Sequence, residues 1–250
     1  VTRDETHLTR GRANTLRLAL SGQLGADAMA SDALAEAMKL CVSCKACRRE
    51  CPTGVDMAKM KLEVLAARAE RHGVSRRESM IAELPRMAPI LRHIAPLMNL
   101  RNHLAPLRLA GQRWLGLAAS RVLPTWRRDA FRDEEAAAMA PAHPRGEVVL
   151  LADTFNRYFE PENLRAALRV LAAAGYRAVM PEHRGRPLCC GRTFLAAGML
   201  DQARAEARRT LGRLGGDLPV IGLEPSCLLT LRDEFRSLLP GARSEERRVG

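Results

Sequence analysis

Aromatic residues, lysines and long apolar runs are all scarce in this 250-residue sequence. Aromatics make up 4% of the chain, and alanine, leucine and arginine take their place, which favours helix. No stretch approaches the roughly 18 apolar residues of a transmembrane helix, so we expect no membrane span. The opening VTRDETHLTRGR lacks a signal peptide's apolar segment, which predicts a cytoplasmic protein. Because the chain begins at Val1 rather than methionine, we expect a fragment.

The net charge of +12 raises the question of a nucleic-acid partner. Only four of the 40 basic residues are lysines, and the arginines are scattered, with no block longer than two. Such a pattern is typical of solvated helix surfaces rather than of a phosphate-binding face. We therefore predict no nucleic-acid binding. A non-enzymatic regulator whose DNA affinity falls steeply with salt is the rival from another class.

Residues 1–75 read as helices around a cysteine-rich loop. Ser31 is placed to cap a helix that runs to about residue 40. Asp56 should cap the helix MAKMKLEVLAARAERH, and Gly73 should end it. Ser75 and Glu78 then form a capping box. These signals predict an all-α segment.

Residues 76–146 are expected to connect two domains. Five prolines should divide the leucine-rich, arginine-dotted stretch 84–126 into short helices: Pro85, Pro89, Pro96, Pro106 and Pro124. A basic amphipathic segment of this kind could contact the inner face of the membrane peripherally. A helical connector packed on a neighbouring domain is the preferred interpretation. The charged, alanine-rich residues 128–145 are predicted to be a linker.

Strand and helix patterns alternate over residues 147–241. VVLLAD, YRAVM and PVIGL read as buried strands, separated by a helix from Pro161 to Gly175 and a long helix over 194–214. This order predicts a small parallel α/β domain. No phosphate loop or G-x-G-x-x-G motif accompanies it. Residues 242–250 break the pattern and are interpreted as a non-native tail.

The strongest motif is Cys41-x2-Cys44-x2-Cys47-x3-Cys51-Pro52, the spacing of bacterial ferredoxins. Two-residue gaps let successive thiolates surround one corner of an iron–sulfur cube. Zinc is the structural rival, but its sites usually combine two separated C-x2-C pairs. In two-cluster ferredoxins the fourth cysteine ligates the other cluster. Cys51 therefore either closes a single cluster or serves one whose other ligands lie upstream of Val1.

Three further cysteines follow predicted strands. Cys189 and Cys190 precede Gly191, and Cys227 begins a helix in EPSC. Helix N-termini stabilise thiolates, so a redox or second-cluster site is favoured over three buried small residues. The carboxyl ends of parallel strands meet at one edge, so we expect these cysteines to converge there, joined by Asp153.

The segment KLCVSCKACRRECPTGVDMAKMKLE resembles the iron–sulfur segment of FAD-linked oxidases of the D-lactate and D-2-hydroxyglutarate dehydrogenase type. LCCG, followed by EPSC, is similar to the cysteine-rich CCG domain at the C-terminal end of that family. Related modules occur in the iron–sulfur subunits of glycolate oxidase and anaerobic glycerol-3-phosphate dehydrogenase. The resemblance extends from Thr2 to about Gly241.

The resemblance implies an α+β protein in which an all-α ferredoxin-like 4Fe–4S domain precedes a small parallel α/β CCG domain. It also implies cluster ligands at Cys41, Cys44, Cys47 and Cys51, and CCG cysteines at Cys189, Cys190 and Cys227. The full CCG pattern has one more cysteine, where this sequence has Asp153, which puts a second cluster there in doubt. The family's FAD-binding and substrate domains are missing, so no catalytic residue can be named.

The expected function is electron transfer within a flavin-dependent 2-hydroxy-acid dehydrogenase. FAD would lie in the missing N-terminal region, in the same chain or in a partner subunit, and a quinone or protein would accept the electrons. The alternative is a stand-alone iron–sulfur subunit of a glycerol-3-phosphate dehydrogenase or glycolate oxidase complex.

Overall fold

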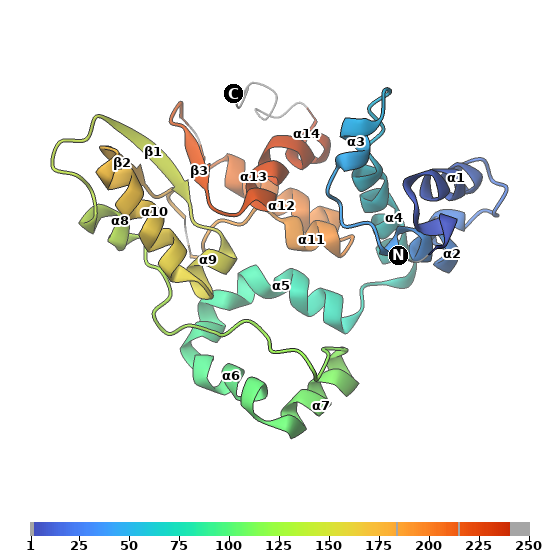
Figure 1. Ribbon diagram of the computed structural model, residues 1–250, viewed down its shortest axis with the longest axis horizontal. Helices are drawn as coiled ribbons and strands as arrows, with labels where there is room; N and C mark the ends of the chain where they lie inside the picture. Colours follow the sequence, from blue (N-terminus) through green and yellow to red (C-terminus); the bar gives the residue numbers. More distant parts are fainter. Residues whose placement is uncertain (1–2, 184, 215, 241–250) are drawn as a thin grey trace. The chain divides into compact units, whose positions relative to one another are not determined.

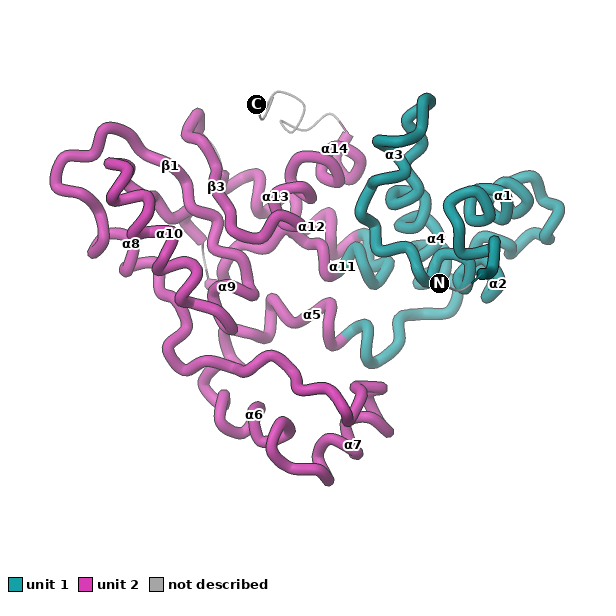
Figure 2. The backbone as a smooth tube through the Cα atoms, in the orientation of Figure 1, with its two compact units in different colours: residues 1–79, 194–200 teal, residues 80–193, 201–250 magenta. Residues whose placement is uncertain are grey.

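The computed structural model describes residues 3–183, 185–214 and 216–240, so the tail at 242–250 lies outside the described residues. The protein is α+β, with many helices and one parallel sheet of three strands. Its contacts group the chain into two compact units (Figure 2). Unit 1 contains residues 1–79 and 194–200, and unit 2 contains residues 80–193 and 201–250.

Unit 1 is built from short helices around a small apolar core. After a 3-10 turn at Glu5–His7 come α1 (Thr9–Leu20), a 3-10 turn at Ala28–Ala30, α2 (Asp32–Lys39), α3 (Ala46–Glu50) and α4 (Met57–His72). The core joins α1, α2 and α4 through the buried side chains of Leu16, Leu34, Met38, Met57 and Val64. The α1–α4 segment is all-helical, as the sequence predicts.

Local capping chemistry sets the ends of these helices. Ser31 Oγ accepts from Leu34 N (3.3 Å), and Asp56 Oδ1 accepts from Ala58 N (3.0 Å). Gly73 ends α4 with a φ of 76°, a conformation that glycine adopts at little cost. All three predicted caps are therefore confirmed.

Helix α5 (Arg76–Leu91) begins with the predicted capping box: Ser75 N donates to Glu78 Oε2 (3.1 Å) and Glu78 N donates to Ser75 Oγ (3.3 Å). The prediction that Pro85 and Pro89 break the chain into pieces is wrong, because both lie inside α5. A proline removes one helical hydrogen bond but does not forbid the helix. Burial of one face, which includes Pro85 itself, compensates for the loss.

The segment after α5 agrees better with the prediction of short helices. A 3-10 turn at Arg92–Ile94 leads into α6 (Ala95–His103) and α7 (Ala105–Leu115), with a proline in the first turn of each. The linker predicted at 128–145 is instead partly packed: α8 (Glu134–Ala138) lies within it. Phe131 is 2% exposed and belongs to the core under the sheet. Because the residues around Phe131 are charged, the sequence pattern did not indicate that Phe131 belongs to the core.

The sheet of unit 2 has the strand order β2-β1-β3, with β1 in the middle (Figure 1). The strands β1 (Gly146–Leu151), β2 (Tyr176–Val179) and β3 (Val220–Gly222) are all parallel. Helices α9 (Thr154–Tyr158) and α10 (Pro161–Ala173) connect β1 to β2. The predicted parallel α/β arrangement is confirmed, and its core includes Leu150 and Leu164.

The long helix predicted over 194–214 is two helices, α11 (Arg192–Ala196) and α12 (Leu200–Leu211). Gly198 separates them with a φ of 73°, which a right-handed helix cannot contain. After β3 come α13 (Pro225–Leu229), a π-helical turn at Thr230–Glu234, and α14 (Phe235–Leu238). None of the helices described here is long and apolar enough to cross a membrane.

Candidate functional site

The four-cysteine run occupies the loop between α2 and α4 in unit 1. Cys41 follows α2, and its N–H donates to Met38 O (3.0 Å). Cys44 lies in the irregular segment before α3, whereas Cys47 lies within α3. Cys51 ends α3, with its N–H bonded to Cys47 O (2.9 Å). A single tight loop thus carries all four thiols.

The backbone of this loop is unusual at two positions. Ser43 and Lys45 have φ values of 56° and 60°, and the only other non-glycine residue described with positive φ is Arg3. The left-handed region costs an L-residue on the order of 1 kcal/mol, and such conformations cluster at functional sites. Ser43 and Lys45 flank Cys44, so the backbone is in this costly conformation on both sides of that thiol.

The thiols of the loop differ in exposure and in partners. Cys44 is exposed, and Cys47 packs partly buried against the core of unit 1. Cys51 Sγ lies 3.1 Å from Thr53 Oγ1, and this hydrogen bond lowers the pKa of Cys51. Lys61 Nζ donates to Cys41 O (2.6 Å), which brings a cation to the loop.

The donor set fits an iron–sulfur cluster in its chemistry. Four thiols lie within eleven residues, and none of the four is fully buried. Among the described residues, no three Cys, His, Asp or Glu side chains are gathered closely enough to hold a metal ion. The thiols of this loop would have to turn toward one another to ligate a cluster together.

The second candidate site lies in unit 2, where sequence-distant cysteines meet. Cys190 Sγ and Cys227 Sγ are 3.2 Å apart. Cys189, Cys190 and Cys227 are all buried, and Gly191 N donates to Cys189 Sγ (3.4 Å). The predicted convergence of Cys190 and Cys227 is confirmed.

We expected helix N-termini to stabilise these cysteines as thiolates, but the surroundings of Cys189 and Cys190 disfavour the charged form. A hydrogen bond with Cys190, together with burial, raises the pKa of Cys189 well above its usual range. For Cys190, the bond with Cys189 lowers the pKa, but the bond to Cys227 and burial outweigh it and raise the pKa to about 12. Cys189 and Cys190 are therefore protonated thiols at neutral pH, because burial disfavours the charged form.

Gly191 explains why the motif reads Cys-Cys-Gly. Its φ is 75°, and a Cβ at this position would lie 3.2 Å from both Ala203 O and Glu206 Cβ. Glycine therefore allows the cysteine loop to approach α12 closely. Thr210 Oγ1 fixes the same loop by donating to Cys189 O (2.8 Å).

Asp153, which we expected to join these cysteines, caps the helix that follows β1. Its Oδ1 caps α9 by accepting from Phe155 N (3.0 Å) and Asn156 N (3.1 Å), and its Oδ2 accepts from Asn156 Nδ2 (2.6 Å). The carboxylate is thus engaged in helix capping. No group of three metal-binding side chains is found in the described part of this region either.

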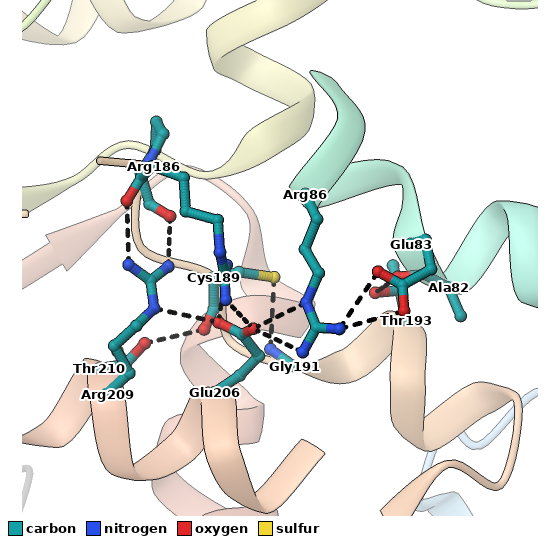
Figure 3. A network of polar contacts seen from close by, with 11 residues as sticks. Ala82, Glu83, Arg86, Arg186, Cys189, Gly191, Thr193, Glu206, Arg209 and Thr210 are labelled. Carbon is teal, nitrogen blue, oxygen red and sulfur yellow. Dashed lines mark hydrogen bonds and ion pairs between the residues drawn. The ribbon is translucent and has the colours of Figure 1, made fainter. Parts of the chain in front are cut away.

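Sequence reasoning missed a buried ion-pair cluster beside Cys189 (Figure 3). The Glu206 side chain is 1% exposed and is surrounded by Arg86, Arg186 and Arg209. Burial favours the protonated acid, but the ion pairs with Arg186 and Arg209 outweigh it and lower the pKa of Glu206. Arg209 Nη1 also donates to Arg186 O (2.9 Å), which ties the chain just before Cys189 to α12.

Only one contact of this ion-pair cluster could be predicted from the sequence. Glu206 and Arg209 are three residues apart, a helix-face spacing. Arg86 is 120 positions away, and no local pattern predicts that Arg86 reaches Glu206.

Comparison with curated proteins finds similarity to dehydrogenases. The D-2-hydroxyglutarate dehydrogenase of Pseudomonas putida is 25% identical over an alignment that covers 96% of this chain and 28% of that protein. The Escherichia coli D-2-hydroxyglutarate dehydrogenase is 22% identical over 84% of this chain and 22% of its own length. One subunit of the Escherichia coli anaerobic glycerol-3-phosphate dehydrogenase is 27% identical over 66% of this chain and 42% of its own length.

These relatives confirm the resemblance predicted from the cysteine motifs. The chain spans about a quarter of the length of the D-2-hydroxyglutarate dehydrogenases it matches. No family model and no solved structure matches the chain.

Proposed function

We propose that this chain is the iron–sulfur electron-transfer region of a flavin-linked 2-hydroxy-acid dehydrogenase. The observation that carries the proposal is the similarity to D-2-hydroxyglutarate dehydrogenase, which covers 96% of this chain but only 28% of that relative. Most of such an enzyme would therefore lie outside these 250 residues. That remainder would supply the FAD and the substrate site.

Residues 1–75 would form the ferredoxin-type domain, with Cys41, Cys44, Cys47 and Cys51 as ligands of a 4Fe–4S cluster. When bound, such a cluster accepts and releases single electrons at a potential set by charge and burial. The chain provides four thiols in one loop, and Lys61 adds a cation beside them. Cys44 is exposed, so an electron donor or acceptor would be able to approach the cluster at this thiol.

Residues 147–241 would form the CCG domain, joined to the first by residues 76–146. Its cysteines are suited to thiol–disulfide chemistry, because Cys190 Sγ and Cys227 Sγ are already 3.2 Å apart. We assign Cys190 and Cys227 as the redox pair and Cys189 as their neighbour. A quinone or an electron-carrier protein would receive the electrons.

A second candidate is a stand-alone component of a multi-subunit dehydrogenase. Its support is the 27% identity to a subunit of the anaerobic glycerol-3-phosphate dehydrogenase, of which this chain covers 42%. The two candidates differ in gene structure. A reading frame that continues upstream of Val1 into an FAD domain favours the first, and a separate gene for that domain favours the second.

The test is the metal content of protein purified without oxygen. We expect a brown protein with iron, acid-labile sulfide and an EPR signal after reduction. Cys44→Ala should lose most of this iron, whereas the neighbouring Ser43→Ala, which removes no thiol, should keep it. Stoichiometric zinc without sulfide, after expression with iron available, would contradict the proposal.

A further inference from the structure

Lys61 and Arg12 bring two cations to the start of the cysteine loop. Lys61, on α4, donates from Nζ to Cys41 O (2.6 Å), and Arg12, on α1, donates from Nε to Ala37 O (3.0 Å) in α2. Both residues are partly buried. Burial lowers the pKa of Lys61, Cys41 raises it, and Arg12 lowers it, so both neighbours lie close enough to act on the ammonium.

These two cations have no carboxylate partner in the part of the chain that the structure describes. Their hydrogen bonds lead only to backbone carbonyls. By contrast, Arg68 on the same helix as Lys61 pairs with Asp32 (3.0 Å). A partly buried charge without a countercharge lowers stability. Lys61 and Arg12 are therefore suited to an anion held by the cysteine loop.

The hydrogen bond from Lys61 also orients a peptide group of the loop. In the trans peptide between Cys41 and Val42, the C=O and the N–H point in opposite directions. The Val42 N–H therefore points away from Lys61. Among the described residues, the N–H groups of Val42, Ser43 and Cys44 have no hydrogen-bond partner. Successive N–H groups in such a turn form concavities that bind anions.

The ammonium and the Val42 N–H lie at the two ends of one peptide dipole. A hydrogen bond to Cys41 O polarises the peptide and makes the Val42 N–H a stronger donor. Lys61 would thus act on an anion in the loop in two ways, by its own charge and through the peptide between Cys41 and Val42.

We propose that Lys61, assisted by Arg12, raises the reduction potential of the 4Fe–4S cluster held by this loop. Reduction adds one electron from the flavin, and therefore one negative charge, while no proton moves and no bond breaks. A fixed cation stabilises the state with more negative charge, and more strongly where water is excluded. The inference rests on the proposed function, because it requires the cluster.

The test is a reductive titration with dithionite, followed by EPR, on the intact chain purified without oxygen. Lys61→Gln removes the charge and should shift the midpoint potential to a lower value. Lys61→Arg keeps the charge and should restore most of the potential. Arg12→Gln should give a smaller shift in the same direction, because Arg12 bonds to α2 rather than to the loop.

The matched control is Lys59→Gln. Lys59 is also on α4 and partly buried, but two positions along a helix place its side chain on the other side from that of Lys61. No hydrogen bond of the Lys59 ammonium is found among the described residues. This variant should keep the potential of the unchanged chain.

Iron, sulfide and far-UV circular dichroism are measured first for every variant. Equal potentials for the unchanged chain and Lys61→Gln would overturn the inference, and so would equal shifts for Lys61→Gln and Lys59→Gln. If Lys61→Gln folds but loses its iron, Arg12→Gln provides the test, and an unchanged potential there overturns the inference. In each of these cases the cluster itself stands. An unchanged chain that holds no iron would instead contradict the proposed function, and this inference with it.

Discussion

Cys190 Sγ and Cys227 Sγ are 3.2 Å apart, although 37 positions separate these residues in the sequence. A disulfide requires about 2.05 Å, so a shift of about 1 Å would join them. Both thiols are buried, and the raised pKa of Cys190 keeps the Cys190 thiol protonated at neutral pH. Geometry favours a bond between these sulfurs, whereas burial slows the reaction that would form it.

The first prediction is that mild oxidation joins Cys190 to Cys227. Each thiol would lose one proton and one electron to form the disulfide, while one hydrogen peroxide is reduced to two waters. Peptide mass spectrometry without reductant should find this link, and a reductant should reverse it. Cys189→Ser should still form the link. A dominant link from Cys189 would contradict the assignment.

The second prediction concerns stability at high pH. The pKa of Cys190 is about 12 in the folded chain, against an ordinary value near 9. Between these values the unfolded chain has lost a proton that the folded chain keeps, so stability falls as the pH rises. The loss is about 4 kcal/mol at most, and it begins near pH 9. Urea unfolding from pH 8 to pH 11 should show a steeper fall for the unchanged chain than for Cys190→Ala. Equal slopes would contradict the raised pKa.

The third prediction concerns Glu206. Glu206→Gln leaves Arg186 and Arg209 without a countercharge beside a buried site, so the free energy of unfolding should fall by about 3 kcal/mol. The lowered pKa of Glu206 means that its contribution is present above the unfolded value near 4.3 and is lost as the pH falls through the folded value. Urea unfolding at neutral pH and in acid measures both effects.

The control for Glu206 is the exposed pair of Asp201 with Arg204, in which the Asp201 side chain is 93% exposed. Asp201→Asn should leave the unfolding midpoint unchanged, because solvent screens exposed ion pairs. Similar effects of Glu206→Gln and Asp201→Asn would show that burial of Glu206 does not matter.

The fourth prediction separates Cys51 from the other cysteines of its run. If a second run lies upstream, Cys51→Ala in the intact protein should alter the EPR signal of a cluster other than the one held by Cys41, Cys44 and Cys47. Thr53→Val serves as the control, because it removes the hydrogen bond to Cys51 Sγ but no ligand. If only the same cluster changes, Cys51 closes a single cube.

Sequence patterns succeeded where the chemistry is local. Ser31, Asp56 and Gly73 act within one turn of their own helices, so their residue types alone placed the helix ends. The convergence of Cys190 with Cys227 was also predictable, because parallel strands direct their following loops to one edge.

Sequence patterns failed where packing decides. Pro85 lies inside α5 because burial outweighs a lost hydrogen bond, and Gly198 interrupts a pattern that reads as continuous helix. Phe131 enters the core from a segment that looks like linker. The partners of Glu206 come from parts of the chain far from α12, and no local window contains them.

The strand order gives the sulfur pair a further property. Both β2 and β3 pair only with β1 in the described sheet, yet Cys190 follows β2 and Cys227 follows β3. The two sulfurs thus meet where the chain segments that follow the two outer strands come together. Cross-linking between Cys190 and Cys227 would therefore report that the segments after the two outer strands have come together, although neither strand pairs with the other.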